Sequence, residues 1–257
     1  MSELRLEYLK RPELTVRQFE VAVLPIGSTE PHAQHLVYGT DTFQVHHFAR
    51  MAVAEANRRG ATCLLLPTMP FSCNVNVHHC PWAMSLQPRT LTDFVTDVVN
   101  SVVRQGVKKV VLLNGHGGNT SVLQAALREL HPKTPAFVAL AEWYAMIGDV
   151  EEEVMETDER GHACEMETSA MLYLFPEGVD MRAAEPTQSR RTAFSTAHLT
   201  FVRPWHAYTR NTGLGDPTKA TAEKGRRMIE AAVDRFAAAL KELSDAPYTD
   251  LFPFVED

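Results

Sequence analysis

Two imidazoles and two carboxylates follow one another closely near the start of the chain. They are Glu30, His32, His35 and Asp41, and they lie within twelve residues. An apolar run at 21–24 precedes them and is typical of a buried strand. In open α/β sheets, ligands bind beyond the carboxyl ends of the strands. Two imidazoles and two carboxylates at such a place suit a divalent metal, although a solvated polar loop would have the same composition.

A second histidine-bearing loop, NGHGGN at 114–119, follows another apolar run at 109–113. Gly115, Gly117 and Gly118 would allow a tight turn and close approach of the backbone to a ligand, and Gly117 is the predicted substrate contact. The loop matches neither GxGxxG nor GxxxxGK[ST], so we discount a phosphate-binding loop. The remaining alternative is a glycine turn in which His116 is incidental.

A third candidate is the segment HACEMETS at 162–169. If this segment is helical, His162 and Glu165 share a face and can act as a ligand pair or as a ligand with a general acid or base. The alternative is a helix start in which glutamates are simply favourable. Trp143 follows the apolar run at 136–141, and this position favours a substrate-pocket wall over a place in the core.

Strand and helix patterns alternate along the chain, which predicts an α/β fold with a mainly parallel sheet covered by helices on both faces. The predicted strands are 21–24 with Ile26 just beyond it, 62–66, 109–113 and 136–141, and the predicted helices are 42–59, 91–105, 121–130, 162–174 and 216–243. The long loop 67–89 has the length of a functional loop. Residues 176–215 read as irregular, with short strands near 201–202.

Composition limits the function classes. The 257 residues carry a net charge of −7 without a long basic run, which disfavours nucleic-acid binding. No apolar run approaches the roughly 20 residues of a membrane helix, and no signal-peptide core is present. The four cysteines form no CxxC pair, and CNVNVHHC at 73–80 fits no common zinc pattern. We therefore expect one cytoplasmic domain spanning 1–257.

Four segments in order resemble the creatininase family, whose members are creatinine amidohydrolase-like proteins. They are LPIGSTEPHAQHLVYGTD at 24–41, NGHGGN at 114–119, HACEMETS at 162–169 and GLGDPTKATAEKG at 213–225. The resemblance implies a three-layer α/β/α sandwich and a divalent metal centre, often with two zinc or manganese ions per chain. It places the metal ligands at Glu30, His32, Asp41 and His116, with Asp41 as the bridge between the ions.

The chain departs from the family pattern at one ligand position. Members that hydrolyse creatinine carry a metal-binding glutamate two residues after the histidine, where this chain has Gly118. In members with NGHGGN, a later helix supplies the carboxylate, so the resemblance implies Glu165 as the fifth ligand. His162 resembles the catalytic histidine of the family. Glu167 either orients His162 or is structural, and His35 is expected either to support a metal ligand or to be structural.

The resemblance predicts metal-assisted hydrolysis. A hydroxide held by the ions would attack the carbonyl of a small polar substrate, a cyclic amide in the first instance, and His162 would protonate the leaving nitrogen. One alternative is carbon–carbon bond hydrolysis in a cyclic ketone such as an oxidised inositol, and another is a non-catalytic metal-bound scaffold. The resemblance also implies a homo-oligomer, since family members are commonly hexamers.

Overall fold

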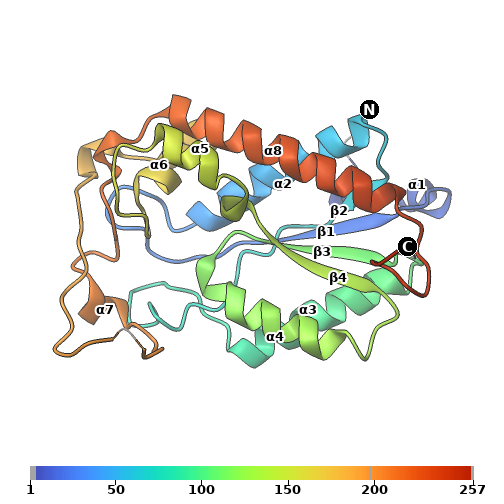
Figure 1. Ribbon diagram of the computed structural model, residues 1–257, viewed down its shortest axis with the longest axis horizontal. Helices are drawn as coiled ribbons and strands as arrows, with labels where there is room; N and C mark the ends of the chain where they lie inside the picture. The colour runs from blue at the N-terminus through green and yellow to red at the C-terminus, as the bar shows by residue number, and fades with distance from the viewer. Residues whose placement is uncertain (1–3, 197, 256–257) are drawn as a thin grey trace.

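The computed structural model describes residues 4–196 and 198–255 and contains a four-stranded parallel sheet in the order β2-β1-β3-β4 (Figure 1). The strands are β1 (Val21–Ile26), β2 (Cys63–Leu65), β3 (Lys109–Asn114) and β4 (Phe137–Glu142). Every residue of β1 and β3 is buried, as expected for the two central strands of a parallel sheet covered on both faces. The predicted parallel sheet is therefore confirmed.

The strand register brings three strand ends together. Ile26 at the end of β1 pairs with Asn114 at the end of β3, which pairs with Glu142 at the end of β4. The loops that leave these strands therefore start from one edge of the sheet. The first two of these loops carry Glu30, His32 and His116.

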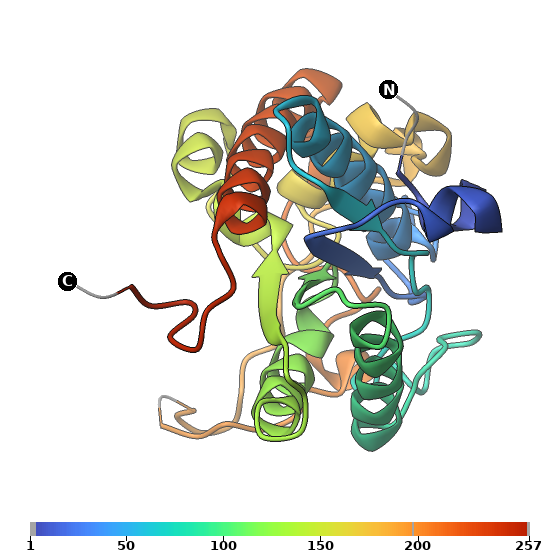
Figure 2. The ribbon, with the colours of Figure 1, turned by 90° about the vertical axis from the view of Figure 1, so that its right-hand side faces the viewer.

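Helices cover both faces of the sheet and make three layers (Figures 1 and 2). The long helices α2 (Thr40–Arg58) and α8 (Ala222–Asp245) lie on one face, and α3 (Pro88–Val103) and α4 (Thr120–Leu130) lie on the other. Alternate residues of β1 enter the two cores: Val21 and Val23 pack with the first pair, and Ala22 and Leu24 with the second. This arrangement confirms the predicted sandwich.

The remaining helices are short. They are η1 (Leu6–Tyr8), α1 (Arg11–Thr15), η2 (Gly117–Asn119), η3 (Trp143–Met146), α5 (Gly148–Val154), α6 (Glu165–Leu174), η4 (Pro176–Gly178), η5 (Met181–Ala183), α7 (Trp205–Tyr208) and η6 (Pro217–Lys219). Within the described residues, no helix has the length and apolar character needed to cross a membrane.

The predicted start of the last helix at Asp216 was wrong. Asp216 accepts a hydrogen bond from the backbone of Thr218 and so caps η6, whereas Thr221 accepts from Lys224 N and caps α8. The helix then packs closely against α6, because a Cβ on Gly225 would lie 1.9 Å from the carbonyl oxygen of Ser169. Only glycine permits this approach, which holds α6 and the residues that precede it in place.

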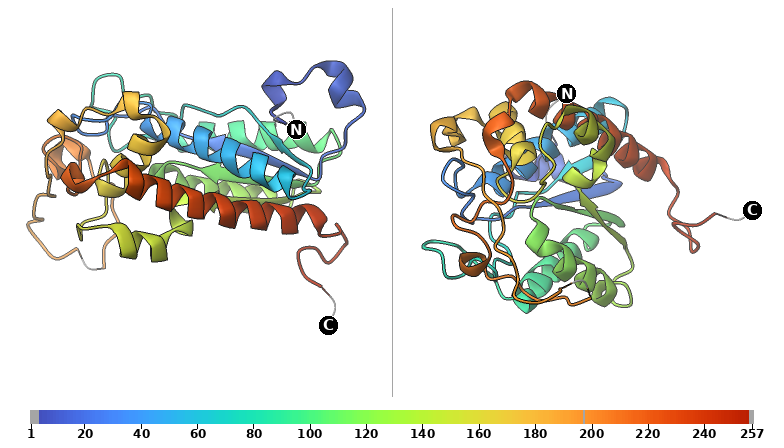
Figure 3. Two further views of the ribbon diagram at one scale, coloured as in Figure 1. Left: turned by 90° about the horizontal axis from the view of Figure 1, so that it is seen from above. Right: turned by 60° about the vertical axis from the view of Figure 1, so that its left-hand side comes forward.

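Two irregular segments, 67–87 and 186–215, lie at the end of the molecule where the strands finish, and we call them the rim (Figure 3). Among its described residues, the second contains α7 as its only helix, and the predicted strands near 201–202 do not form. The segments contact each other, because the backbone N–H of Trp205 donates to the carbonyl oxygen of Asn76 at 2.9 Å.

Candidate metal centre

Close packing against α2 positions the loops that follow β1 and β3. A Cβ on Gly27 would lie 2.5 Å from the Cα of Thr42, and a Cβ on Gly115 would lie 2.6 Å from the Cβ of Val45. Glycine at both positions therefore lets each strand end approach the start of α2. Asp41 lies in the first turn of that helix, where the positive end of the helix dipole favours a carboxylate.

Four of the predicted ligands come together at this point. The Nδ1 of His116 lies 3.0 Å from Glu30 Oε1 and 2.9 Å from Asp41 Oδ2. On the other side of Asp41, its Oδ1 lies 3.0 Å from the Nε2 of His32. All four residues are buried. The structure thus assembles Glu30, His32, Asp41 and His116 from three separate segments.

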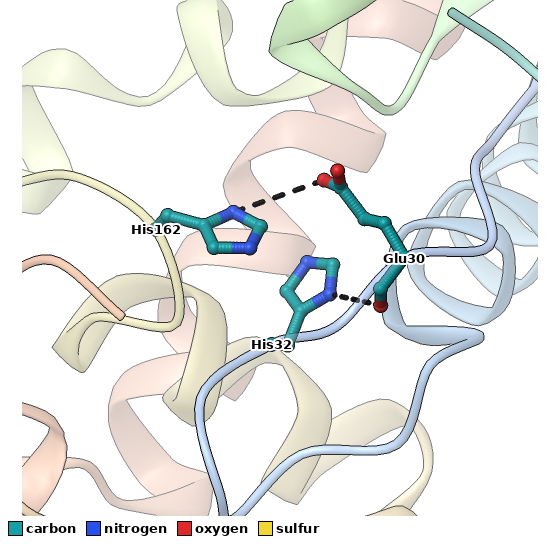
Figure 4. A group of neighbouring side chains, drawn as sticks. All are labelled: Glu30, His32 and His162. Atoms are coloured by element: carbon teal, nitrogen blue, oxygen red, sulfur yellow. Dashed lines mark hydrogen bonds and ion pairs between the residues drawn. The ribbon is translucent and has the colours of Figure 1, made fainter. Parts of the chain in front are cut away.

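The side chains form overlapping groups of potential metal ligands. Glu30, Asp41 and His116 make one group, and His32, Asp41 and Glu167 make another; within each group the ligand atoms lie within 4.8 Å of one another. Asp41 belongs to both groups. A third group joins Glu30 and His32 to His162, whose Nδ1 lies 3.9 Å from Glu30 Oε1 (Figure 4).

Backbone carbonyl groups orient all three imidazoles. The Nδ1 of His32 lies 3.1 Å from Glu30 O, the Nε2 of His116 lies 3.3 Å from Cys73 O, and the Nε2 of His162 lies 2.9 Å from Pro31 O. Since a carbonyl can only accept, we assign the N–H of each ring to that nitrogen, which leaves the other nitrogen facing the carboxylates. Metal-binding histidines characteristically have this arrangement.

Opposite charges set the protonation of the buried cluster. Burial disfavours a charged His32, but the carboxylate of Asp41 raises its pKa to about 9. Burial also works against the charge of His116, whereas Glu30 and Asp41 raise its pKa well above the usual range. Burial disfavours ionised Glu30, yet His116 lowers the pKa of that carboxyl. A divalent cation would balance the same carboxylates in place of the imidazolium charges.

The expected fifth ligand, Glu165, does not join the cluster. Its carboxylate is buried elsewhere, 2.5 Å from Lys224 Nζ, and it also accepts hydrogen bonds from Thr157 and from the backbone of Glu156. The prediction was wrong because α6 begins at Glu165, so His162 precedes the helix in an extended segment that pairs with Leu214. The spacing rule that would place His162 and Glu165 on one helical face therefore does not apply.

Glu167 takes the position that was expected of Glu165. Residues two apart on a helix point in nearly opposite directions, so the Glu167 carboxylate turns toward His32 and Asp41. Its Oε2 accepts a 2.5 Å hydrogen bond from the backbone of Ala163. Burial raises the pKa of this carboxyl, while His162 and His32 act in the opposite direction. The sequence offered Glu167 as a second carboxylate in the motif but did not distinguish it from Glu165.

Trp205 is a site residue that the sequence did not indicate. Its ring centroid lies 4.9 Å from that of His162 and 5.6 Å from that of Tyr208. His162 itself also packs at 4.1 Å against the ring of His32. The histidine is therefore held between a rim residue and the buried cluster.

The prediction of Trp143 as a pocket wall was wrong. Only 1% of its surface is exposed, and it packs in the core beside Phe48, with 6.3 Å between the ring centroids. The chain turns into η3 directly after β4, which directs this side chain under α2 and α8. A position at the end of a strand does not by itself determine whether a side chain faces a pocket or the core.

The glycines of the NGHGGN turn differ in their surroundings. Gly117 is exposed, and a Cβ there would meet nothing within 4 Å, so its contact with substrate stays a prediction. A Cβ on Gly118 would lie 2.3 Å from the Nε2 of His116. A residue without a side chain is therefore needed at position 118 to leave room for the His116 ring.

A polar network behind the turn fixes His116. The side chain of Asn114 accepts from His116 N at 3.1 Å and donates to His116 O at 2.8 Å. Asn114 in turn donates to Glu142, which also accepts from Thr120 and Tyr144. Side chains from four elements, β3, β4, α4 and η3, therefore hold His116 in position.

The other histidines near the site lie outside the cluster. His35 is buried, and its Nε2 lies 2.9 Å from Thr168 Oγ1, as expected of a structural histidine. His78 and His79 lie on the exposed part of the rim, and the Nε2 of His79 lies 3.3 Å from Cys80 Sγ.

Comparison with known proteins decides the family. A family model described as creatinine amidohydrolase matches residues 7–240. The chain belongs to the creatininase family. Creatininase-family members are hydrolases, and this chain is accordingly a hydrolase of that family. The chain is 30% identical to a Bacteroides fragilis protein proposed to be a creatinine amidohydrolase, with a TM-score of 0.87 over 97% of this chain and 100% of that one.

Similar creatininase-family proteins act on different substrates. A 3-dehydro-scyllo-inosose hydrolase of Thermotoga maritima is 26% identical over 92% of this chain and 82% of its own length. A mycofactocin precursor peptide peptidase of Mycobacterium tuberculosis is 29% identical over 82% of this chain and 81% of its own length. Solved creatininases with the same fold include a manganese form and a zinc–zinc form, each 24% identical to this chain, with TM-scores of 0.77 and 0.76.

Proposed function

We propose that this creatininase-family hydrolase cleaves an amide C–N bond in a small polar substrate, with a cyclic amide as the first candidate. The observation that carries the proposal is the position of Asp41, which two groups of potential ligands share. Glu30, Asp41 and His116 would hold one divalent ion, and His32, Asp41 and Glu167 would hold a second. Asp41 would then bridge the two ions.

The residues present fit such ions. Imidazole nitrogens and carboxylate oxygens suit zinc and manganese, and the carbonyl groups that orient His32 and His116 leave one nitrogen of each ring for a metal. The manganese and zinc forms of other creatininases support the same choice. When bound, the ions would polarise a carbonyl group and lower the pKa of a water from 15.7 toward about 7.

His162 is positioned to donate or accept the proton that the reaction transfers. Pro31 O accepts a hydrogen bond from its Nε2, so its Nδ1 is the nitrogen that faces Glu30 and the cluster. Protonated at Nδ1, the ring can donate to the leaving nitrogen of an amide, and neutral at Nδ1 it can accept a proton. The rings of Trp205 and His32 both pack against the His162 ring, and this packing limits the positions that the imidazole can adopt.

The proposal is tested by metal analysis and a substrate panel. We expect purified protein to contain up to two zinc or manganese ions per chain. A chelator should remove metal and activity together, and either metal should restore both. Activity toward cyclic or linear amides should depend on His162. Full activity in protein that contains no metal would contradict the proposal.

A second candidate is hydrolysis of a carbon–carbon bond in a cyclic ketone, which the similarity to the Thermotoga maritima hydrolase favours. Such a reaction has no leaving amine, so His162→Ala should impair it less than amide hydrolysis. Turnover of a cyclic ketone, with no turnover of any amide in the panel, would select this candidate.

We also propose that the protein is a cytoplasmic homo-oligomer, with a hexamer as the first expectation and without a nucleic-acid or membrane partner. Exposed apolar side chains support self-association, among them Leu251, Phe254 and Val255 near the C-terminus. Light scattering of the purified protein measures the oligomeric state directly.

A further inference from the structure

The two rim segments lack acidic residues. Segment 186–215 contains four arginines and two histidines but no aspartate or glutamate, and segment 67–87 contains two histidines and again no acid. The chain as a whole carries a net charge of −7. The rim therefore concentrates positive charge in a protein that is otherwise acidic.

The rim also borders the metal centre. Trp205 contacts the ring of His162, and two residues before it in the sequence is Arg203. The rings of His79 and His206 lie 4.2 Å apart between centroids, which joins the two rim segments beside α7. Figure 3 places α7 and the loop of 67–87 at the same end of the molecule. A substrate that enters from this end passes the positive charges first.

Within the part of the chain that the structure describes, three of the four rim arginines have no carboxylate partner. Arg210 pairs with Glu185 at 3.0 Å. Arg190 donates to the carbonyl oxygens of His206 and Thr209 and so fastens α7. Arg203 donates to the hydroxyl of Tyr208 at 3.3 Å, and among the described residues neither Arg203 nor Arg191 pairs with a carboxylate.

A run of contacts connects Arg203 to the proposed general acid. Its guanidinium carbon lies 5.2 Å from the ring centroid of Tyr208, the ring of Tyr208 lies 5.6 Å from that of Trp205, and the ring of Trp205 lies 4.9 Å from that of His162. Arg203 is thus linked to His162 through two aromatic rings, which places the cation on the same side of the rim as the proposed general acid.

We propose that the substrate is an anionic amide whose carboxylate or phosphate group binds Arg203, with Arg191 as a second cation, while its amide lies at His162. The inference rests on the proposed function of the metal centre. A guanidinium group binds such anions through two parallel hydrogen bonds. The positive electrostatic potential of the rim also raises the local concentration of anions, and added salt weakens this effect. Trp205 supplies the apolar wall between the two ends.

The first test compares paired substrates. Metal-loaded protein is given cyclic and linear amides, each carrying either a carboxylate or the isosteric neutral carboxamide. We expect kcat/KM for the carboxylate to be about 10- to 100-fold higher, the range for one charge-assisted contact. Arg203→Gln should remove this preference by raising KM for the carboxylate, and Arg203→Lys should keep part of it.

The matched control is Arg58→Gln. Arg58 is exposed in the last turn of α2, at the opposite end of that helix from Asp41. This variant removes the same charge from the protein without touching the rim, so it should leave the preference unchanged.

The second test measures binding without turnover. Glutarate and inorganic phosphate are titrated into metal-loaded His162→Ala protein by calorimetry, at about 20 and about 200 mM salt. We expect the affinity for the probe to be lower at the higher salt concentration. It should also fall at least about 10-fold in Arg203→Gln. The better-bound probe identifies the anion as a carboxylate or a phosphate.

The outcomes separate this inference from the proposed function. Arg203-dependent binding of glutarate or phosphate supports the inference even if no amide is hydrolysed, in which case only the proposed function fails. Equal turnover of carboxylate and carboxamide substrates, with no effect of Arg203→Gln, overturns the inference and leaves the proposed function intact.

Discussion

The candidate metal centre and the rim lie side by side but are built in opposite ways. In the centre, each imidazole is buried or nearly so and is fixed by a backbone carbonyl, and the loops leave the central strands through glycines that pack against α2. In the rim, Trp82 is 80% exposed, Phe194 is 61% exposed, and α7 is only one turn long. The sheet and α2 therefore fix the candidate ligands in place, whereas residues of the rim can vary without disturbing them.

This difference gives a physical reason for the range of substrates among similar proteins. Irregular surface segments tolerate substitution far better than a buried cluster of charges does. The hydrolase of Thermotoga maritima and the peptidase of Mycobacterium tuberculosis share the family with this chain and differ in substrate. We expect substitutions in the centre to change metal binding and substitutions in the rim to change recognition.

The largest effect is expected at Asp41, which both ligand groups share. Asp41→Asn should reduce the metal content from two ions per chain to nearly none and lower hydrolase activity by about 1,000-fold or more, because metal ions contribute several kcal/mol to such reactions. Elemental analysis by mass spectrometry measures the metal. The surface variant His131→Gln is the control, and an Asp41→Asn protein that keeps both ions would contradict the two-ion arrangement.

Two variants on α6 should separate an effect on metal affinity from an effect on folding stability. Glu167→Gln should weaken one metal site by about 10- to 100-fold, because a neutral amide is a poor ligand beside His32 and Asp41. Glu165→Gln should keep metal affinity but lower the free energy of unfolding by about 2 kcal/mol, since Lys224 loses a buried partner. Metal titration and urea unfolding measure the two effects, and reversed results would restore Glu165 as the ligand.

The glutamate pair also shows where prediction from sequence stops. Apolar runs and glycines were enough to place the strands, the layers and the loops with Glu30, His32 and His116, because burial and backbone geometry act locally. The choice between Glu165 and Glu167 depends on the residue at which α6 begins. That residue is set by contacts distant in sequence, such as the pairing of His162 with Leu214 and the close approach of Gly225.

The rim was beyond prediction for a related reason. Its segments lack the periodicity that indicates helices or strands, so their positions follow from a few long-range contacts. The hydrogen bond from Trp205 to Asn76 is one of them, and it joins residues more than a hundred positions apart. The contact of Trp205 with His162 could not have been inferred from either motif. Trp143, which the sequence favoured for this role, lies in the core instead.

A smaller effect is expected from His35, which is buried beside α6 and bonds to Thr168. Burial lowers its pKa to about 4, with a further contribution from His32. The folded protein therefore resists protonation of His35 while the unfolded chain accepts a proton near pH 6.5. The contribution of neutral His35 to stability is complete above about pH 6.5 and is lost as the pH falls toward 4.

Urea unfolding of chelator-treated protein at several pH values measures this dependence. The difference between wild type and His35→Gln should shrink as the pH falls from 6.5 to 4, because glutamine has no proton to gain. The surface variant His131→Gln should follow the wild type throughout. Parallel curves for wild type and His35→Gln would mean that another group dominates the acid response of the centre.

The smallest effect is expected at Trp205, where the two regions touch. The residue is half-buried and packs on His162 from the rim, so it acts on the general acid without contacting any proposed metal ligand directly. Trp205→Ala should lower kcat by about 10-fold, the cost of roughly 1.4 kcal/mol in holding the imidazole. Metal content should stay unchanged, and Trp205→Phe should restore most of kcat because it keeps an aromatic contact. Loss of metal in Trp205→Ala would show instead that the rim supports the ligands themselves, and the two regions could then no longer be treated as separate.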